Sequence, residues 1–245
     1  MAEYNSSTYG DRIADAYDSL VPMSAQATAA AVDALARLAG PGPALELGVG
    51  TGRIAIPLAA RGIAVHGIDG SQAMLDKLRS KPSGDKITIA RADFEQIPLD
   101  RHFHLIYVVF NTFFALLTQE AQVRCFQSVA DHLEPRGLFV IEAFVPDLTL
   151  YTRGLHISMM GTSNDSVRLN VAQLDAARQH ITDSVVTLSE CGTRLYPLQL
   201  RFAYPSELDL MARLAGLRLR ERWSSWAGEP FTSQSGNHVS IYEKP

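Results

Sequence analysis

The feature that most constrains the fold is the stretch 44–53, Ala-Leu-Glu-Leu-Gly-Val-Gly-Thr-Gly-Arg, in which an apolar run leads into three glycines at alternate positions. This pattern predicts a short buried strand, a tight turn and a helix that begins near Ile54. Glycine adopts positive φ without strain and leaves space where a Cβ would collide with a ligand. The amides at the start of the following helix favour negative charge. The stretch is therefore typical of α/β folds that bind nucleotide-like ligands.

Two details of this stretch narrow the class of ligand. The third glycine comes one residue too early for the G-x-G-x-x-G dinucleotide fingerprint, and no Gly-Lys-Ser/Thr phosphate loop follows. Glu46 would repel a pyrophosphate, but it suits a ligand that carries an ammonium and a sulfonium. Here the sequence resembles the class I S-adenosylmethionine-dependent methyltransferases, whose first motif is E-x-G-x-G-x-G. The resemblance implies an S-adenosylmethionine site that includes Glu46, Gly48, Gly50 and Gly52.

Length, charge and cysteine content limit the other options. A chain of 245 residues fits one α/β domain. The net charge of −4 argues against nucleic acid as the main partner. The two cysteines provide no disulfide framework and no metal cluster of the usual spacing, so we expect no metal. No apolar run approaches the roughly 20 residues that cross a bilayer, and the polar start Met1–Gly10 is unlike a signal peptide, so we expect a soluble, cytoplasmic protein without a membrane partner.

Apolar segments alternate with segments of helical spacing between residues 44 and 144, which predicts a doubly wound α/β sheet. Two further strands are expected at Leu217–Trp226 and His238–Tyr242. Together with the resemblance, this implies a Rossmann-like sheet of about seven strands with the last strand antiparallel. Before this sheet, Asp11–Leu20 has the spacing of one helix.

Between residues 151 and 204 the pattern changes to alternation with a period of two. The segments 167–171, 180–188 and 195–202 predict three antiparallel strands joined by short turns, inserted between the fifth strand and the last helix. We expect this insert to lie above the active-site edge, where it would cover a pocket or pair two subunits of a homodimer. We expect one methyltransferase domain, residues 1–245, that contains the insert.

Asp69 is the first side chain outside the glycine turn that points to a ligand. It ends the second expected strand, about 20 residues beyond the turn, and at this spacing an acidic side chain can accept both hydroxyls of a ribose. Asp69 could instead only cap the helix that begins near Ser71. The resemblance extends the cofactor site to Tyr9, Arg12, Tyr17, Asp69, Gly70, Met74, Asp93, Phe94 and Phe110. It implies that Arg12 pairs with the methionine carboxylate and that Asp93 accepts from the adenine amino group.

The candidates for catalysis are fewer. Methyl transfer from a sulfonium is an in-line displacement in which good placement of the reactants is worth on the order of 7 to 11 kcal/mol. A general base helps only when the acceptor holds its proton at neutral pH. Glu142 ends a central strand at the ligand-binding edge, and it could orient a substrate hydroxyl or amine or bond only to backbone or Arg12. His156 in the insert and His238 at the last strand are the candidate bases.

The acceptor side resembles bacterial natural-product methyltransferases, including those that dimethylate antibiotic aminosugars. These aminosugar enzymes tend to carry a histidine after the fourth strand, where this chain has Ala115 beside Phe113 and Phe114. An aromatic or otherwise apolar small molecule is therefore at least as plausible an acceptor as an aminosugar. Candidate substrate residues are Asn111, Phe114, Phe144, Tyr204 and Trp226.

We expect transfer of a methyl group to an oxygen or nitrogen atom of a small natural product, with S-adenosylhomocysteine as the second product. Methylation of protein or RNA is disfavoured by the acidic charge and by the sequence Asn111-Thr-Phe-Phe114 where an Asn/Asp-Pro-Pro-Tyr motif would stand. A non-catalytic S-adenosylmethionine-binding protein and a dinucleotide dehydrogenase remain as alternatives.

Overall fold

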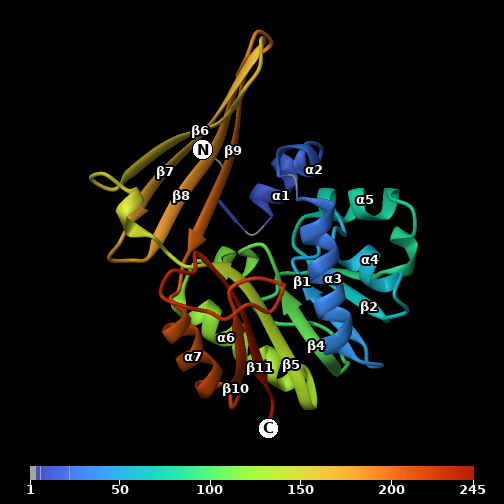
Figure 1. The fold of residues 1–245 in the computed structure, drawn as a ribbon. Helices are drawn as coiled ribbons and strands as arrows, with labels where there is room; N and C mark the ends of the chain where they lie inside the picture. The colour runs from blue at the N-terminus through green and yellow to red at the C-terminus, as the bar shows by residue number, and fades with distance from the viewer. Residues whose placement is uncertain (1–3, 6, 22) are drawn as a thin grey trace.

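The computed structural model describes residues 4–5, 7–21 and 23–245, which form two separate β-sheets (Figure 1). The larger sheet has seven strands in the order β3-β2-β1-β4-β5-β11-β10. Its strands are β1 (Ala44–Leu47), β2 (Val65–Asp69), β3 (Thr88–Arg91), β4 (Phe103–Val108), β5 (Leu133–Phe144), β10 (Arg218–Trp223) and β11 (Asn237–Glu243). The pairs among β1 to β5 are parallel, whereas β11 runs antiparallel to both of its neighbours. This confirms the predicted Rossmann-like sheet with its last strand antiparallel.

Helices cover both faces of this sheet. On one face lie α3 (Ala25–Ala39), α4 (Ala55–Ala59) and α5 (Gln72–Ser80), and on the other lie α6 (Gln119–His132) and α7 (Pro205–Leu214). Single 3₁₀ turns are η1 (Gly84–Lys86), η2 (Thr112–Ala115) and η3 (Leu148–Leu150). Strand β4 shows the arrangement, because Leu105 and Tyr107 pack toward α3 while Ile106 and Val108 pack toward α6. Both faces of a central parallel strand are thus buried, which explains its nearly continuous apolar sequence.

The insert forms the second sheet, of four antiparallel strands in the order β6-β7-β8-β9. They are β6 (Leu155–Thr162), β7 (Ser166–Asp175), β8 (His180–Ser189) and β9 (Gly192–Arg201). It stands beyond the carboxyl ends of the parallel strands, as Figure 1 shows. The prediction of three strands was wrong, because β6 was missed. Strand β6 is an edge strand whose sequence, Leu-His-Ile-Ser-Met-Met-Gly-Thr, loses its alternation at Met160 and places Leu155, Ile157 and Met159 on an exposed face.

The N-terminal segment lies between the two sheets. It forms two short helices, α1 (Thr8–Ile13) and α2 (Tyr17–Leu20), where one helix was predicted. Helix α1 contacts both α5 and β9 (Figure 1). The break at Ala14–Ala16 lets Ile13 and Tyr17 join one apolar cluster with Met74 of α5 and Tyr196 of β9. Tertiary packing therefore interrupts a segment whose spacing alone favours a continuous helix.

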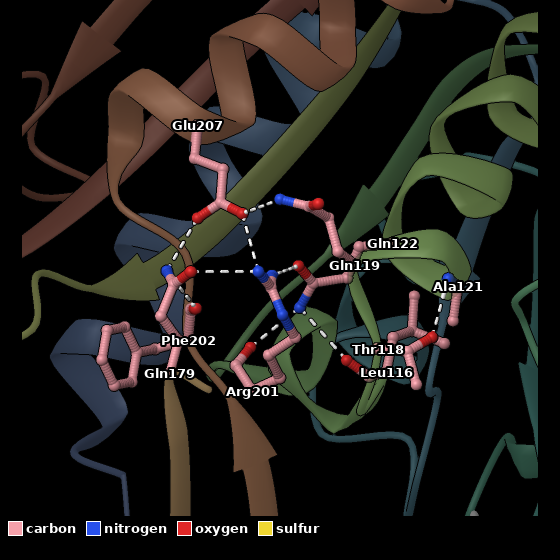
Figure 2. Close-up of polar contacts among 9 residues, drawn as sticks. All are labelled: Leu116, Thr118, Gln119, Ala121, Gln122, Gln179, Arg201, Phe202 and Glu207. Atoms are coloured by element: carbon pink, nitrogen blue, oxygen red, sulfur yellow. Dashed lines mark hydrogen bonds and ion pairs between the residues drawn. The ribbon is translucent and has the colours of Figure 1, made fainter. Parts of the chain in front are cut away.

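A buried polar network fixes the base of the insert to the larger sheet (Figure 2). Arg201, at the end of β9, is 5% exposed and donates to Gln122 Oε1 of α6 at 2.5 Å and to Glu207 Oε1 of α7 at 2.8 Å. Gln179 Oε1 accepts from the same guanidinium at 3.1 Å. Burial alone would raise the pKa of Glu207, but the hydrogen bonds from Gln179, Arg201 and Gln119 together lower it. The network makes the insert a fixed extension of the core at this end.

Within the part of the chain that the structure describes, no helix combines the length and the apolar character that a membrane span needs.

Candidate active site

The glycine turn after β1 has a different requirement at each of its glycines. All three have positive φ: 74° at Gly48, 53° at Gly50 and 78° at Gly52. A Cβ on Gly48 would lie 2.4 Å from Thr112 Cγ2, and one on Gly52 would lie 2.9 Å from Leu78 Cγ. At Gly50 the nearest atom to an added Cβ is a backbone oxygen at 4.0 Å. Packing therefore demands glycine at two positions, while Gly50 lines the adjoining cleft and keeps it open to a ligand.

Asp69 ends β2 beside this turn. Its Oδ2 accepts from the Gly50 amide and its Oδ1 accepts from the Ser71 amide, each at 2.8 Å. Burial raises the pKa of Asp69, against the opposing effect of these two amides. The cap of α5 is the Ser71 hydroxyl, which accepts from the Met74 amide at 3.2 Å. Asp69 is therefore not the helix cap, and the second lone pair on each oxygen remains available to a ligand hydroxyl.

Glu46 lies in β1, on the strand that leads into the turn, and is 2% exposed. The Tyr107 hydroxyl donates to its Oε2 at 3.0 Å. Burial raises the pKa of Glu46 to about 8, the charge of Asp69 adds to the rise, and the bonds from Tyr107 and the Ala55 amide oppose it. A carboxyl group in this state is mostly protonated at neutral pH and ionises when a cation approaches.

Three tyrosines of the N-terminal segment, Tyr4, Tyr9 and Tyr17, line the cleft together with the glycine turn. The cavity that remains has a volume of about 110 Å³. This volume is smaller than the about 300 to 1,000 Å³ of a typical small-molecule site. One contact that holds the segment is the Tyr4 hydroxyl, which accepts from the Gln199 amide of β9 at 3.1 Å.

The predicted cofactor residues divide into two groups in the structure. The residues that line the cleft are Tyr9, Tyr17, Gly48, Gly50, Asp69, Met74 and Phe94. Those that do not line the cavity directly are Arg12, Glu46, Gly52, Gly70, Asp93 and Phe110. Arg12 is exposed, and Asp93 is exposed with its Oδ1 accepting from the Glu95 amide at 2.9 Å. Their roles toward the methionine carboxylate and the adenine amino group stay predictions.

Arg53 is a cation near the cleft to which the sequence analysis gave no role. Its guanidinium carbon lies 4.9 Å from the centroid of the Tyr17 ring and 5.3 Å from that of Phe110. Its Nη2 lies 3.7 Å from Asp18 Oδ1, and the Arg53 side chain is only 15% exposed. The sequence signal that could have pointed to Arg53 is its position directly after Gly52, the last glycine of the motif. Arg53 thus packs on Tyr17, which lines the cleft, whereas Arg12 is exposed.

A larger cavity, which we call the insert cavity, lies between the end of β5 and the insert and has a volume of about 440 Å³. Its walls are mostly apolar, and its polar side chains are Asp147, Tyr151, His156, Asn170 and Asp183. Of the predicted residues, Phe144 and His156 line it. His156 Nδ1 lies 3.0 Å from the Leu150 carbonyl oxygen. Because a carbonyl can only accept, Nδ1 carries the proton, and in the neutral ring Nε2 keeps a free electron pair.

Glu142 has both carboxylate oxygens engaged. Its Oε2 accepts from the Phe110 amide at 3.0 Å, and its Oε1 accepts from the Trp226 indole at 2.8 Å. Burial raises the pKa of Glu142, and these two bonds oppose the rise. Phe110 and Asn111 both have positive φ, 55° and 64°, and Asn111 Oδ1 accepts from the Phe144 amide at 2.7 Å. These contacts favour a positioning role, in which Glu142 holds the turn after β4.

The structure does not bring the remaining candidates to either cavity. His238 is fully buried, with Nδ1 2.9 Å from Ser240 Oγ, and burial together with Arg222 lowers its pKa to about 4. Phe114 is fully buried, and its ring centroid lies 5.1 Å from that of Phe144. Tyr204 is the N-terminal cap residue of α7. Their catalytic and substrate roles stay predictions.

Comparison with known proteins identifies the family. The family described as "Methyltransferase domain" matches residues 44–137. The structure of the CcbJ methyltransferase from Streptomyces caelestis is 37% identical and has a TM-score of 0.90, and the match covers 98% of this chain and 99% of that one. The chain belongs to the S-adenosylmethionine-dependent methyltransferases.

Other relatives of this methyltransferase are natural-product enzymes. The cypemycin N-terminal methyltransferase of Streptomyces sp is 29% identical over 201 residues, which are 82% of each chain. S-adenosylmethionine-bound CalS10, an amino pentose methyltransferase from Micromonospora echinaspora, has a TM-score of 0.70 at 18% identity and covers 94% of this chain and 95% of its own, which shows the shared fold. The predicted enzyme class and cofactor are confirmed.

The residues around the cleft of this methyltransferase have the chemistry that S-adenosylmethionine requires. Gly50 leaves room where a Cβ would enter the cleft, and Asp69 offers two carboxylate oxygens to a diol. Glu46 is an acid without an arginine or lysine partner among the described residues, and Arg53 supplies the opposite charge beside Tyr17. The chemistry of these groups matches an amino-acid head that carries one ammonium and one carboxylate.

Proposed function

We propose that this methyltransferase methylates a nitrogen or oxygen atom of a small acceptor that binds in the insert cavity. The observation that carries the proposal is the cavity itself. Its volume of about 440 Å³ lies in the range of small-molecule sites, and it combines apolar walls with a few polar side chains. A site of this kind fits a natural product better than an extended RNA or protein surface.

The insert cavity adjoins the cofactor cleft along the inner face of the insert. Leu198 of β9 lines the cleft, and its direct cross-strand partner Asp183 of β8 lines the cavity. Directly opposed residues of an antiparallel pair have Cβ atoms about 4.5 to 5.5 Å apart. An acceptor in the cavity would therefore lie next to a ligand in the cleft.

The proposed chemistry follows from this arrangement. When bound, S-adenosylmethionine supplies an electrophilic methyl group on a sulfonium. The walls of the cavity would exclude water and hold the acceptor in line, which is where most of the rate gain of such a displacement arises. His156 Nε2 would take a proton from an acceptor that carries one, since Nδ1 is already bonded to Leu150.

Nitrogen is the favoured acceptor atom. The curated relative that matches most of the chain, the cypemycin enzyme, is named an N-terminal methyltransferase. This name supports an amine acceptor, and its natural-product context supports a secondary metabolite.

The proposal can be tested by a substitution that fills part of the insert cavity with a larger side chain. Leu150→Trp should lower kcat/KM for the acceptor by about tenfold, which corresponds to about 1.4 kcal/mol of activation free energy. The affinity for S-adenosylhomocysteine should stay within about twofold of that of the parent protein. Leu195→Trp is the matched control, because Leu195 is equally exposed (56%, against 54% for Leu150) and does not line the insert cavity. Bulk RNA and protein extract are offered in parallel, and preferential labelling of either would contradict a small-molecule acceptor.

We also propose that residues 151–204 serve one methyltransferase domain both as a cover for the acceptor and as a pairing surface. The outward face of the insert exposes apolar side chains, of which Ile157 and Met159 on the edge strand β6 are 67% and 69% exposed. An apolar edge strand of this kind supports pairing with a second copy of the chain. Light scattering should show a dimer that Ile157→Lys converts to a monomer, and a monomeric parent protein would contradict the proposal.

A further inference from the structure

Among the described residues, most acidic side chains without an ion pair are exposed, but four are at least partly buried. Asp18, Asp209 and Glu207 each pair with an arginine or lysine. Among the described residues, the acids whose pKa burial raises are Glu46, Asp69, Glu142 and Asp183, and none of them forms an ion pair. The first three surround the carboxyl ends of β1, β2 and β5. Asp183 comes from the insert, and neither the sequence nor the function proposed so far assigns it a role.

The surroundings of Asp183 are those of a binding group. The residue is partly buried and lines the insert cavity. Its Oδ1 accepts from Asn170 Nδ2 at 2.6 Å, and the Ser184 amide also donates to the carboxylate. These two neutral donors orient the group without neutralising its charge, and a carboxylate has further acceptor positions.

The charge of Asp183 reaches both cavities. It contributes to the raised pKa of Tyr151, whose side chain lines the insert cavity, and to that of Tyr9, whose side chain lines the cofactor cleft. A protonated His156 would lower the pKa of Asp183, so the imidazole is also close. Asp147 also lines the cavity, with its Oδ1 accepting from the Thr149 amide and hydroxyl. Most of the remaining wall is apolar, formed by Phe144, Val145, Pro146, Leu148, Leu150, Ile181 and Leu200.

We propose that Asp183 binds the protonated nitrogen of an amine acceptor, oriented by Asn170, and holds it in the insert cavity next to the cofactor cleft. The inference rests on the proposed function and names its substrate class, an amine on a largely apolar scaffold. Removing a carboxylate from water into a largely apolar wall costs free energy. A cationic nitrogen offsets that cost through a charge-assisted hydrogen bond, which a neutral alcohol or amide does not provide. An anionic acceptor would be repelled.

The bound ammonium has to lose one proton before its electron pair is free. In this step the N–H bond of R–NH₃⁺ breaks, the proton moves to His156 Nε2, and the electron pair stays on the nitrogen of R–NH₂. The imidazolium that forms returns its proton to water. Asp183 lies close to both groups and stabilises the positive charge before and after the transfer.

The test uses the full chain saturated with S-adenosylhomocysteine and three probe amines, phenethylamine, cyclohexylamine and glucosamine. Each amine is compared with its N-acetyl derivative and with the matching alcohol. Calorimetry should show that the amines bind at least tenfold more tightly than their neutral counterparts. Asp183→Asn should remove at least tenfold of this amine affinity, while S-adenosylhomocysteine affinity changes less than twofold.

Two further variants guard against a folding artefact. Asp183→Glu keeps the charge and should retain amine binding within about threefold of the parent protein, whereas Glu190→Gln removes one charge from the exposed turn between β8 and β9 and should change nothing. Equal binding of amines and alcohols, or amine affinity unchanged in Asp183→Asn, overturns the inference.

Transfer of radiolabelled methyl separates failure of the inference from failure of the proposed function. Labelling of the alcohols alone would sink the assignment of an amine acceptor and leave a small-molecule methyltransferase. Labelling of none of these probes, with labelling of bulk protein or RNA, would overturn both.

Discussion

The cofactor cleft and the insert cavity are built in different ways. The cleft depends on the main chain. Every second residue of its turn is a glycine with positive φ, and the amides of Gly50 and Ser71 orient the Asp69 carboxylate. The insert cavity depends on side chains, and its residues come from β5, from 145–151, from all four insert strands and from the loop before β11. A site made of main-chain groups tolerates change in the surrounding sequence, whereas a site made of side chains changes its ligand with each substitution. The difference suits an enzyme family that keeps one cofactor and varies the acceptor.

The largest expected effect tests the main-chain character of the cleft. Gly50→Ala should weaken S-adenosylhomocysteine binding by about 100-fold, close to 2.7 kcal/mol, because its Cβ would enter the space a ligand needs. Gly216→Ala is the matched control, since Gly216 also has positive φ (77°) and nothing within 4 Å of an added Cβ. Both variants should lose about 1 kcal/mol of stability from backbone strain. Equal affinities in the two variants would contradict the assigned role of Gly50.

Asp69 should give the next largest effect. Asp69→Ala removes the acceptor predicted for the ribose hydroxyls and should weaken S-adenosylhomocysteine by about 30-fold, within the range of a lost charge-assisted hydrogen-bond pair. Asp100→Ala should change the affinity by less than about threefold, because Asp100 is exposed and does not line the cleft. Titration calorimetry of the two variants measures the difference. Unchanged affinity in Asp69→Ala would remove the ribose assignment.

The same contrast explains what could be predicted from the sequence. The glycine turn and Asp69 are 17 to 21 positions apart along the chain, and local rules for strands, turns and helix starts fix their relation. Most of the cleft lining outside the insert was predicted in this way or from the family resemblance. The alternation of apolar segments with segments of helical spacing between residues 44 and 144 likewise predicted the larger sheet.

The acceptor side could not be predicted in the same way. Asp183 and Asn170 meet only because β7 and β8 pair in one register, and they face the cavity only because Arg201 anchors the insert to α6 and α7. No local pattern marks either residue. Strand β6 was missed for a related reason, since its apolar residues point away from the core.

Glu142 stands between the two regions, and its effect should fall on turnover. In Glu142→Gln the new amide group must face either the Phe110 amide or the Trp226 indole, and both are donors. The turn after β4 should relax, with kcat lowered by about tenfold and S-adenosylhomocysteine affinity changed by less than about threefold. Glu221→Gln is the control, because Glu221 accepts from the Trp223 indole at an exposed site. Steady-state kinetics that show normal turnover would dismiss any role for Glu142.

The smallest effect concerns proton binding by Glu46 in the ligand-free protein. Its pKa of about 8 lies above the ordinary value of 4.5, so the folded state holds this proton more tightly than the unfolded chain does. The contribution of Glu46 to stability is therefore greatest below pH 4.5 and falls as the pH rises toward 8, by at most about 1.4 kcal/mol per pH unit. For a chain of this size the loss corresponds to roughly 3 to 5 °C in Tm per pH unit.

Glu46→Gln isolates this contribution, because the glutamine oxygen can still accept from Tyr107 while the side chain no longer titrates. The Tm of the variant should fall less steeply than that of the parent protein between pH 5 and 8, with the remaining slope due to groups such as Asp69. Saturating S-adenosylhomocysteine should remove the difference, since a bound ammonium stabilises the ionised Glu46. Parallel Tm curves for the two proteins without ligand would show that Glu46 is already ionised at neutral pH. Glu46 would then carry its negative charge before the ligand binds, and binding of the ligand would not change its protonation state. In that case both carboxylates of the cleft would be prepared in advance, since two amides already orient the Asp69 carboxylate.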